Sequence, residues 1–386
     1  MKPYPGPMSP GGEHARQPRH LQRRARRLRP TTSRRQRGNP TISDVARKAG
    51  VSPMTVSRVL NGEGNVRPVT RAAVKAAIAA LSYSPNPAAR SLAGAAPVRI
   101  GLLYSNPSAA YLSEFLVGSL DFASRANIQI IVEKCGAGAH AGEAATRLLR
   151  GGIEGIVLPP PLCDAPALLE VLRAAGGLAV TVASGDPAPG FSAVSIDDHR
   201  AAFDMTRHIA GLGHQRIGFI IGNPDQTASA RRLAGYRDAL AAVGLPYADE
   251  LVAQGLFTYR SGLDMAEQLL DLARPPSAIF ASNDDMAAAT VAVAHRHGLD
   301  VPNDLTVCGF DDTALATTIW PELTTIHQPI TEMSLAAVQL LVREIRSRRA
   351  GHPDAARHIQ LDFELIRRQS DAAPRRRPLV TPKPPY

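Results

Sequence analysis

Cysteine is scarce in this sequence, which has only Cys135, Cys163 and Cys308 among its 386 residues. The three are widely spaced, form no CxxC pair and have no histidine at zinc-ligand spacing. Such isolated cysteines argue against a disulfide-stapled scaffold and against a cysteine-based zinc site. We therefore expect reduced thiols, no metal site and no other cofactor.

Long apolar runs are also missing. No stretch reaches the roughly 18 uninterrupted apolar residues that a membrane-spanning helix needs. No apolar segment follows the arginine-rich N-terminus, as it would in a signal peptide. The sequence thus predicts a soluble, cytoplasmic protein without membrane contact.

The common catalytic motifs are absent as well. We find no GxSxG, P-loop or HExxH motif, and no GxGxxG at the first strand-to-helix turn. We interpret five histidines as surface residues of helices and loops: His199, His208, His214, His295 and His297. The expectation is a protein that is not an enzyme.

Positive charge is abundant and unevenly distributed. Of the net charge of +10, residues 1–40 alone hold ten arginines and Lys2 against Glu13. Residues 41–94 add seven basic residues against two acidic ones, and residues 371–386 add four against one, which leaves −8 for residues 95–370. A basic N-terminal part and an acidic body are typical of a nucleic-acid reader that carries a separate regulatory domain.

The composition divides the chain into segments. Residues 1–40 are rich in Pro, Gly, Gln and Arg and predict a disordered tail, either a non-specific attractor of DNA or an over-extended gene start. Helical patterns and breakers predict an all-α unit over 41–84 and a separate helix with its linker over 85–97. A second disordered tail is expected over 371–386.

The body, residues 98–370, alternates short apolar strands with amphipathic helices. The predicted strands are Val98–Tyr104, Ile128–Glu133, Gly155–Leu158, Leu178–Val182, Arg216–Ile221, Ser277–Ala281 and Leu305–Gly309. This pattern indicates parallel sheets covered on both faces, and the number of strands exceeds one compact sheet. We predict two α/β lobes, an N-lobe of about 98–197 and 327–356 and a C-lobe of about 198–326 and 357–370, which bind ligand at the carboxyl ends of their strands.

The segment from Thr41 to Asn61 has the lengths of a helix-turn-helix. A capping box begins the first helix at Thr41, Gly50 ends it, and Ser52 begins the second. One side of the second helix is apolar, with Val56, Val59 and Leu60, so its other side is free to read DNA. A plain helical hairpin is the alternative that this pattern leaves open.

Several motifs resemble the lactose-repressor/galactose-repressor family. In the headpiece they are Thr41-Ile42-Ser43-Asp44-Val45-Ala46, Thr55-Val56-Ser57-Arg58-Val59-Leu60-Asn61 and Ser84-Pro85-Asn86-Pro87-Ala88-Ala89-Arg90-Ser91-Leu92. In the body they are Ala281-Ser282-Asn283-Asp284-Asp285, Gly309-Phe310-Asp311-Asp312 and Leu323-Thr324-Thr325-Ile326-His327-Gln328-Pro329. The resemblance implies a multidomain chain: an all-α helix-turn-helix headpiece, a hinge helix, and a two-lobed α/β effector domain like the type I periplasmic binding proteins.

The resemblance also implies a set of DNA contacts. Arg58 would read guanine, Leu92 of the hinge helix would wedge into the minor groove, and Thr55 and Arg67 would meet phosphate. The full set is Thr41, Pro53, Met54, Thr55, Ser57, Arg58, Asn61, Arg67, Ala89 and Leu92. The family often has hydrogen-bonding side chains where this chain has Pro53 and Met54, so base specificity would depend mainly on Arg58 and Ser57.

For the effector, the resemblance implies contacts from Arg232, Asn283 and Asp311 and an aromatic platform at Phe257. Tyr111 and Asp197 are weaker candidates. Helix capping is the alternative role for Asp311 and Asp284, and we favour it for Asp284 only. A sugar is the expected ligand, with a nucleoside or a phosphorylated metabolite as the next possibilities.

These expectations combine into one function. The chain would be a homodimeric repressor of carbohydrate uptake or catabolism genes that binds double-stranded operator DNA and is released by a small sugar. The alternative is an exported sugar-binding protein without a DNA role. Residues 41–94 and the missing signal peptide count against that alternative.

Overall fold

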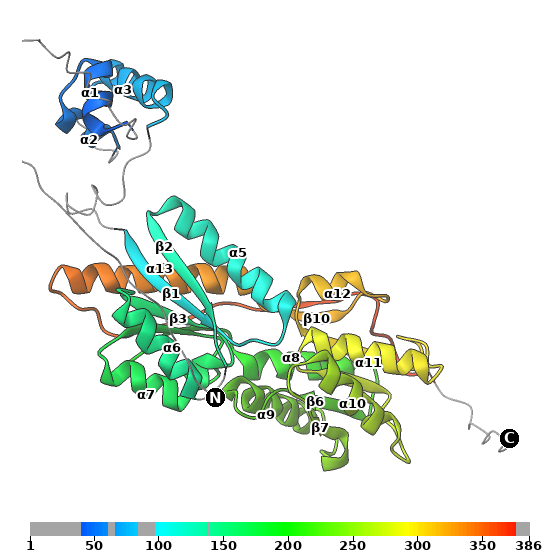
Figure 1. The fold of residues 1–386 in the computed structure, drawn as a ribbon. Coiled ribbons are helices and arrows are strands. Elements are labelled where there is room, and N and C mark those ends of the chain that lie inside the picture. The colour runs from blue at the N-terminus through cyan, green and yellow to red at the C-terminus, as the bar shows by residue number, and fades with distance from the viewer. Residues whose placement is uncertain (1–39, 61–65, 84–96, 137–138, 376–386) are drawn as a thin grey trace, which may run out of the picture. The chain divides into compact units, whose positions relative to one another are not determined.

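The computed structural model describes residues 40–60, 66–83, 97–136 and 139–375 (Figure 1). The chain divides near residue 90 into two compact units. The first is small and helical, and the second holds two six-stranded sheets. In the described residues, no helix is long and apolar enough to cross a membrane.

The helical unit consists of α1 (Ile42–Ala49), α2 (Pro53–Leu60) and α3 (Pro68–Ala80). Six residues, two from each helix, form its buried core: Val45, Ala46, Val56, Val59, Val74 and Ala77. Leu60, which we predicted on the packed side of α2, is instead 37% exposed. It is the last residue of its helix, and this small core does not cover it.

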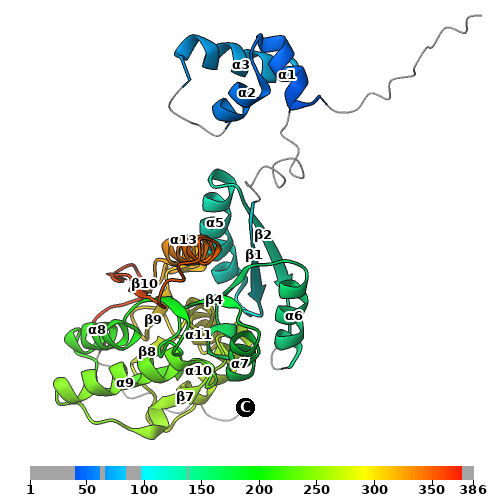
Figure 2. The same ribbon diagram turned by 90° about the vertical axis from the view of Figure 1, so that its left-hand side faces the viewer.

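The N-lobe is built on a parallel sheet of order β11-β5-β4-β3-β1-β2. Its strands are β1 (Val98–Tyr104), β2 (Ile128–Lys134), β3 (Gly155–Leu158), β4 (Leu178–Val182), β5 (Ser192–Ser195) and β11 (His358–Gln360). Helices α5 (Ala109–Arg125) and α13 (Ile330–Arg349) cover one face, and α6 (Ala139–Arg150) and α7 (Pro166–Ala174) cover the other (Figure 2). Central strands such as β3 are buried along their whole length, as expected for a sheet covered on both faces.

The C-lobe repeats this plan with the order β12-β10-β9-β8-β6-β7, in which only β12 is antiparallel. Its strands are β6 (Ile217–Ile221), β7 (Val252–Gln254), β8 (Ala278–Ala281), β9 (Thr306–Asp311), β10 (Thr324–His327) and β12 (Glu364–Ile366). Helices α8 (Asp198–Gly211) and α9 (Thr227–Ala242) cover one face, and α10 (Tyr259–Leu270) and α11 (Asp284–Arg296) the other. The short elements are η1 (Leu162–Asp164) in the N-lobe, and η2 (Asp249–Leu251) and α12 (Ala314–Thr318) in the C-lobe.

The chain passes between the lobes three times. The first two crossings, after β5 and after β10, lie within a few residues of the predicted boundaries. The third lies between β11 and β12, not at 356–357, because β11 pairs with β5 of the N-lobe. The sequence signal failed there because β11 is a three-residue edge strand with two exposed residues.

The predicted C-terminal tail is partly folded. Asp371 is 7% exposed, and its carboxylate lies 2.7 Å from the His208 ring and accepts a 2.6 Å hydrogen bond from the Thr324 hydroxyl. The Ala372 carbonyl lies 2.8 Å from Nε2 of His214, which is only 2% exposed. The prediction that His208 and His214 lie on the surface is therefore wrong, because residues 371–372 cover them.

Candidate DNA-reading helix and effector pocket

Local hydrogen bonds set the turn between α1 and α2. The Thr41 side chain and the Asp44 side chain form the reciprocal capping box that starts α1. Gly50 ends the helix with φ 66°, a left-handed conformation that disfavours residues with a Cβ. Ser52 then accepts a 3.2 Å hydrogen bond from the Thr55 amide at the start of α2. The predicted helix–turn–helix connection is therefore present.

One face of α2 is exposed while the other packs. Val56 and Val59 are buried, whereas Met54 is 64% exposed and Pro53 and Arg58 are also exposed. The remaining predicted reader, Ser57, is half-buried.

The other predicted DNA contacts have separate positions. Thr55 is half-buried with its hydroxyl 2.9 Å from that of Ser52, and the exposed Arg67 precedes α3. Asn61, Ala89 and Leu92 lie outside the described residues, as do residues 1–39 and residues 84–96, where the hinge helix is predicted.

In the body, a pocket lies where the two lobes meet at the carboxyl ends of their strands. Five of the six predicted effector residues line it: Tyr111, Arg232, Phe257, Asn283 and Asp311. The other lining residues are Asn106, Pro107, Ser108, Pro160, Ala183, Gln226, Ala228 and Gln328. Asp197 is not among them, because it is an exposed N-cap of α8 that accepts a hydrogen bond from the Arg200 amide.

Arg232 on α9 is the central cation of this pocket. It is 3% exposed, donates from Nε to Asp198 at 2.8 Å and from a terminal nitrogen to the Ser282 carbonyl at 2.5 Å. Its guanidinium lies 3.5 Å from the ring centroid of Phe310, so it is also stacked. These contacts hold the guanidinium in one orientation, and sequence reasoning did not find Asp198 as its partner.

Asn283 takes the helix-capping role that we predicted for Asp284. Asn283 is the N-cap of α11, accepting from the Met286 amide at 3.0 Å, although it also lines the pocket and donates to the Phe257 carbonyl. Asp284 does not cap α11; it accepts from the Thr313 amide at 2.8 Å and from the Thr325 hydroxyl at 2.7 Å. Burial raises the pKa of Asp284 to about 7.

Asp311 lies at the end of β9 and caps no helix, since the residue preceding α12 is Thr313. It is 5% exposed, and its carboxylate accepts a 3.3 Å hydrogen bond from Nε2 of the Gln328 side chain. Burial raises the pKa of Asp311 well above its usual range, although the nearby Arg232 opposes that shift. A carboxyl group in this setting can both accept and donate hydrogen bonds to a ligand.

Strained backbone is concentrated around this pocket. Six non-glycine residues of the described chain have left-handed φ values, and three of them line the pocket: Ala183, Phe257 and Asp311. Phe257, at φ 59°, also needs the glycine at position 222, because a Cβ there would lie 1.9 Å from the phenyl ring. Such outliers gather at functional sites.

Two polar atoms on the pocket wall have no hydrogen-bond partner among the described residues: the Tyr111 hydroxyl and Oε1 of Gln328. Burial raises the pKa of Tyr111 well above its usual range, so its hydroxyl remains a donor. Unpaired buried polar atoms are costly and need an explanation. A polar ligand would satisfy both, and Gln328 is a residue that sequence reasoning did not assign to the site.

Direct hydrogen bonds join the lobes on both sides of the pocket. Asp164 of the N-lobe accepts from the Thr227 amide at 2.9 Å and thereby caps the N-terminus of α9 in the C-lobe. On the other side, the Ser108 hydroxyl donates to Asp285 at 2.6 Å. The cavity between them has a volume of only about 30 Å³, which is less than a sugar needs. The lobes must part, or side chains must move, for a sugar to enter.

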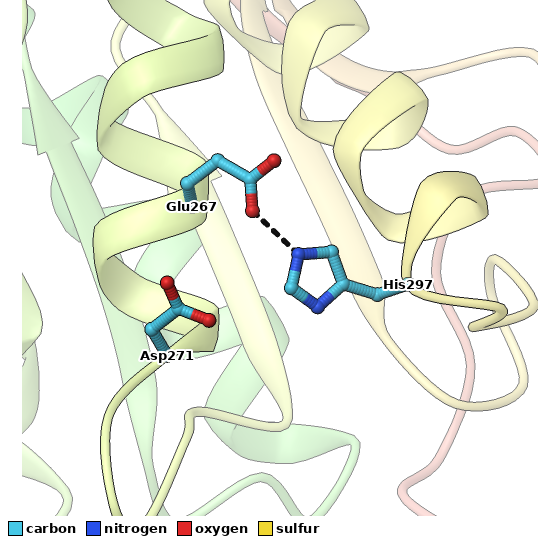
Figure 3. A group of neighbouring side chains, drawn as sticks. All are labelled: Glu267, Asp271 and His297. Carbon is cyan, nitrogen blue, oxygen red and sulfur yellow. Dashed lines mark hydrogen bonds and ion pairs between the residues drawn. The ribbon is translucent and has the colours of Figure 1, made fainter. Parts of the chain in front are cut away.

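One further group has the composition of a metal site. Ligand atoms of Glu267, Asp271 and His297 all lie within 4.8 Å of one another (Figure 3). However, the two oxygens of Glu267 already bind Arg296 at 2.6 Å and His297 at 2.5 Å. This group is explained as an ion-pair cluster between α10 and the end of α11.

Comparisons with known proteins agree with this geometry. Residues 41–86 match the family model for bacterial regulatory proteins of the lacI family, and residues 206–370 match a periplasmic binding protein-like domain. Catabolite control protein A of Priestia megaterium is 34% identical over 307 residues, covering 79% of this chain and 92% of that protein. The chain belongs to the LacI family.

Solved LacI-family structures extend the match to the fold. The complex of the regulator CelR with cellobiose is 32% identical with a TM-score of 0.66, covering 86% of this chain and 99% of the other. The lac repressor dimer bound to operator and an anti-inducer is 28% identical with a TM-score of 0.70, covering 87% and 100%. The LacI-family chain is thus a DNA-binding transcriptional regulator and not an enzyme, and the exported binding protein is no longer needed as an alternative.

Proposed function

We propose that this chain is a homodimeric, sugar-responsive repressor of genes for carbohydrate uptake or catabolism. The observation that carries the proposal is the interlobe pocket, where Arg232, Asn283 and Asp311 surround a space bordered by unpaired polar atoms. A regulator that reads chromosomal DNA acts in the cytoplasm, and we propose that location.

The pocket has the chemistry of a sugar site. Sugars offer adjacent hydroxyls, and a fixed guanidinium, an amide and a carboxyl group can bind them in pairs. Phe257 adds an aromatic ring, and the Tyr111 hydroxyl and Gln328 Oε1 supply one donor and one acceptor. The solved complex of the CelR relative contains cellobiose, which favours a saccharide here over the nucleoside or phosphorylated metabolite.

For DNA, we propose that α2 enters the major groove with Pro53, Met54, Ser57 and Arg58 toward the bases. Arg58 would contact guanine in a bidentate manner, and Met54 would meet a thymine methyl group. Thr41, Thr55, Asn61 and Arg67 would support this contact, while Ala89 and Leu92 would enter the minor groove.

Exposed apolar side chains on the N-lobe support the dimer proposal. Val117 and Leu120 on α5 are 59% and 50% exposed, and Val132 on the edge strand β2 is 41% exposed. Two-fold related headpieces would read two half-sites, as operator-bound family dimers require. Because effector and operator would bind one coupled system, each must change the affinity for the other by the same factor.

A sugar panel tests the effector proposal. Full-length protein would be melted with mono- and disaccharides, and a ligand at about 100 times its Kd adds about 2.7 kcal/mol to the free energy of unfolding. Asn283→Ala should abolish the shift, whereas Asp197→Ala, outside the pocket, should keep it. If no saccharide stabilises the wild type, the pocket has another ligand.

Selection from a random duplex pool tests the DNA proposal. The wild type should enrich a two-fold symmetric site, and Arg58→Ala should lose about 1–3 kcal/mol of base discrimination at one position per half-site. Arg67→Ala should weaken binding evenly across sequences. An Arg58→Ala variant with unchanged selectivity would show that α2 does not read the bases.

A further inference from the structure

The helices of the N-lobe end in arginines. Because helices run opposite to the parallel strands, the C-termini of α5, α6, α7 and α13 lie at the edge where the strands begin. The last turns of these helices hold seven exposed arginines: Arg125, Arg147, Arg150, Arg173, Arg346, Arg348 and Arg349. We call this set the basic edge.

Helix dipoles alone do not account for the basic edge. Cations at helix C-termini are stabilising in general, so both lobes should show them equally. The four main C-lobe helices, α8 to α11, hold only Arg296 and two histidines in their last turns. The enrichment is therefore specific to the N-lobe.

The net charges of the two lobes differ in the same direction, because the C-lobe has more acidic residues and an equal number of basic ones. The N-lobe segments, 98–196 and 330–361, contain 11 basic and 11 acidic residues. The C-lobe segments, 197–329 and 362–370, contain 11 basic and 19 acidic residues. Two of the N-lobe acids, Glu114 and Asp164, accept hydrogen bonds from backbone amides of the C-lobe. They therefore lie where the lobes meet and not at the basic edge.

Three members of the basic edge form no salt bridge with a carboxylate among the described residues: Arg150, Arg346 and Arg348. Arg348 donates only to the Gly176 carbonyl, at 2.8 Å. Between α6, the start of β4 and α13 lies an open concavity of about 570 Å³, whose charged border consists of Arg150, Arg348 and the ion pair of Arg349 with Glu154. Guanidiniums around a concave surface are suited to an extended anion.

The basic edge is also where the chain enters the body. β1 begins at Val98 on this edge, and Arg349 donates to the carbonyl of the preceding Pro97 at 3.5 Å. The DNA-reading unit is therefore tethered to the edge that carries the arginines.

We propose that the basic edge binds the phosphate backbone of DNA beside the operator. This inference rests on the proposed operator binding and adds a second, sequence-independent contact made by the effector domain. The contact strengthens binding by releasing counterions and does not alter which bases are read.

The test uses full-length protein and the duplex enriched by selection, once without and once with about one helical turn of random sequence on each side, some 10 bp. Affinity is measured by fluorescence anisotropy over a range of KCl concentrations. The wild type should show a steeper slope of log K against log salt on the long duplex. The variant R150A/R346A/R348A should lose that difference, with the slope falling by about 0.9 for each phosphate contact removed.

A matched variant controls for the loss of three charges. R207A/R260A/R274A removes exposed C-lobe arginines and should keep the wild-type slope on both duplexes. If the triple variant folds poorly, the single variant Arg346→Glu, at an exposed position, replaces it. We expect this variant also to flatten the slope on the long duplex.

The outcomes separate the two proposals. If the wild type enriches an operator but the edge variants keep its slope on the long duplex, the basic edge does not bind DNA. Binding of polyglutamate is measured in parallel. If the edge variants lose affinity for this acidic polypeptide but not for the long duplex, the basic edge likewise does not bind DNA. If the wild type enriches no duplex, the failure lies with the proposed operator binding itself.

Discussion

The two lobes share a strand order but contribute different chemistry. The C-lobe supplies the charged part of the pocket, Arg232 and Asp311, whereas the N-lobe supplies neutral groups such as Tyr111 and Ser108. At the other end of the strands the N-lobe supplies the charge, because the arginines of the basic edge belong to it. One framework can thus hold two proposed binding sites, since side chains at strand and helix ends can change without disturbing the sheets.

The largest effect is expected from the buried cation of the C-lobe. Arg232→Ala leaves Asp198, whose side chain is 1% exposed, without its counterion and should lower the free energy of unfolding by about 3–5 kcal/mol. Urea unfolding measures this loss. Arg231→Ala is the matched control, because that exposed neighbour donates only to the Gly185 carbonyl. Equal losses for the two variants would refute a special role of the buried pair.

A restoring variant sharpens this result. Replacing both members, as D198N/R232M, should recover much of the stability, since no unpaired charge stays buried. It should not recover sugar binding, because the guanidinium is gone. Recovery of both properties would show that Arg232 only supports the fold.

The second effect concerns pH and the buried Asp284. Burial raises its pKa from an ordinary value of 3.8 to about 7, so the folded state binds the proton more tightly than the unfolded state. Its contribution to stability is complete below about pH 4 and is lost as the pH rises to about 7, amounting to no more than about 4 kcal/mol. Asp284→Asn should flatten this decline in urea unfolding at successive pH values, while Asp225→Asn, at an exposed site, should not.

The third effect tests the junction between the lobes. Asp164→Ala removes the cap that the N-lobe places on α9 and should cost about 1–2 kcal/mol. Asp197→Ala removes a cap of α8 within the C-lobe at similar cost. Only the Asp164 variant should increase the radius of gyration in small-angle scattering and change sugar affinity. If the two variants scatter alike, the interlobe cap does not hold the lobes together.

The smallest change in stability is expected at the N-lobe wall. Tyr111→Phe removes a hydroxyl that has no partner among the described residues, so the free energy of unfolding should stay within about 1 kcal/mol of the wild type or rise. Sugar affinity should nevertheless fall roughly tenfold, the effect of one lost hydrogen bond. Calorimetric titration measures the affinity. A clear loss of stability with unchanged affinity would mean that the hydroxyl serves the fold.

Local sequence signals predicted the bounds of helices and strands correctly where those bounds depend on residues close together in the chain. The capping box at Thr41, the stop at Gly50 and the strand bounds of Gly155–Leu158 follow from short-range chemistry and periodicity. These signals failed where the structure depends on segments far apart in sequence. Examples are β11, which pairs with β5, and His214, which the C-terminal residues cover. The sequence also did not separate helix caps from pocket residues, since Asn283 caps α11 and lines the pocket, whereas Asp284 does neither.

The sequence by itself determined the helix-turn-helix, the alternation of strands and helices and five residues that line the pocket. These features depend on neighbours in the chain or on family motifs. The tertiary structure decided the Asp198–Arg232 pair, the Asp164 cap across the lobes, the unpaired atoms of the pocket and the gathering of arginines at one edge. Each of these joins residues far apart in sequence, and only the packing of two sheets and their helices brings such residues together.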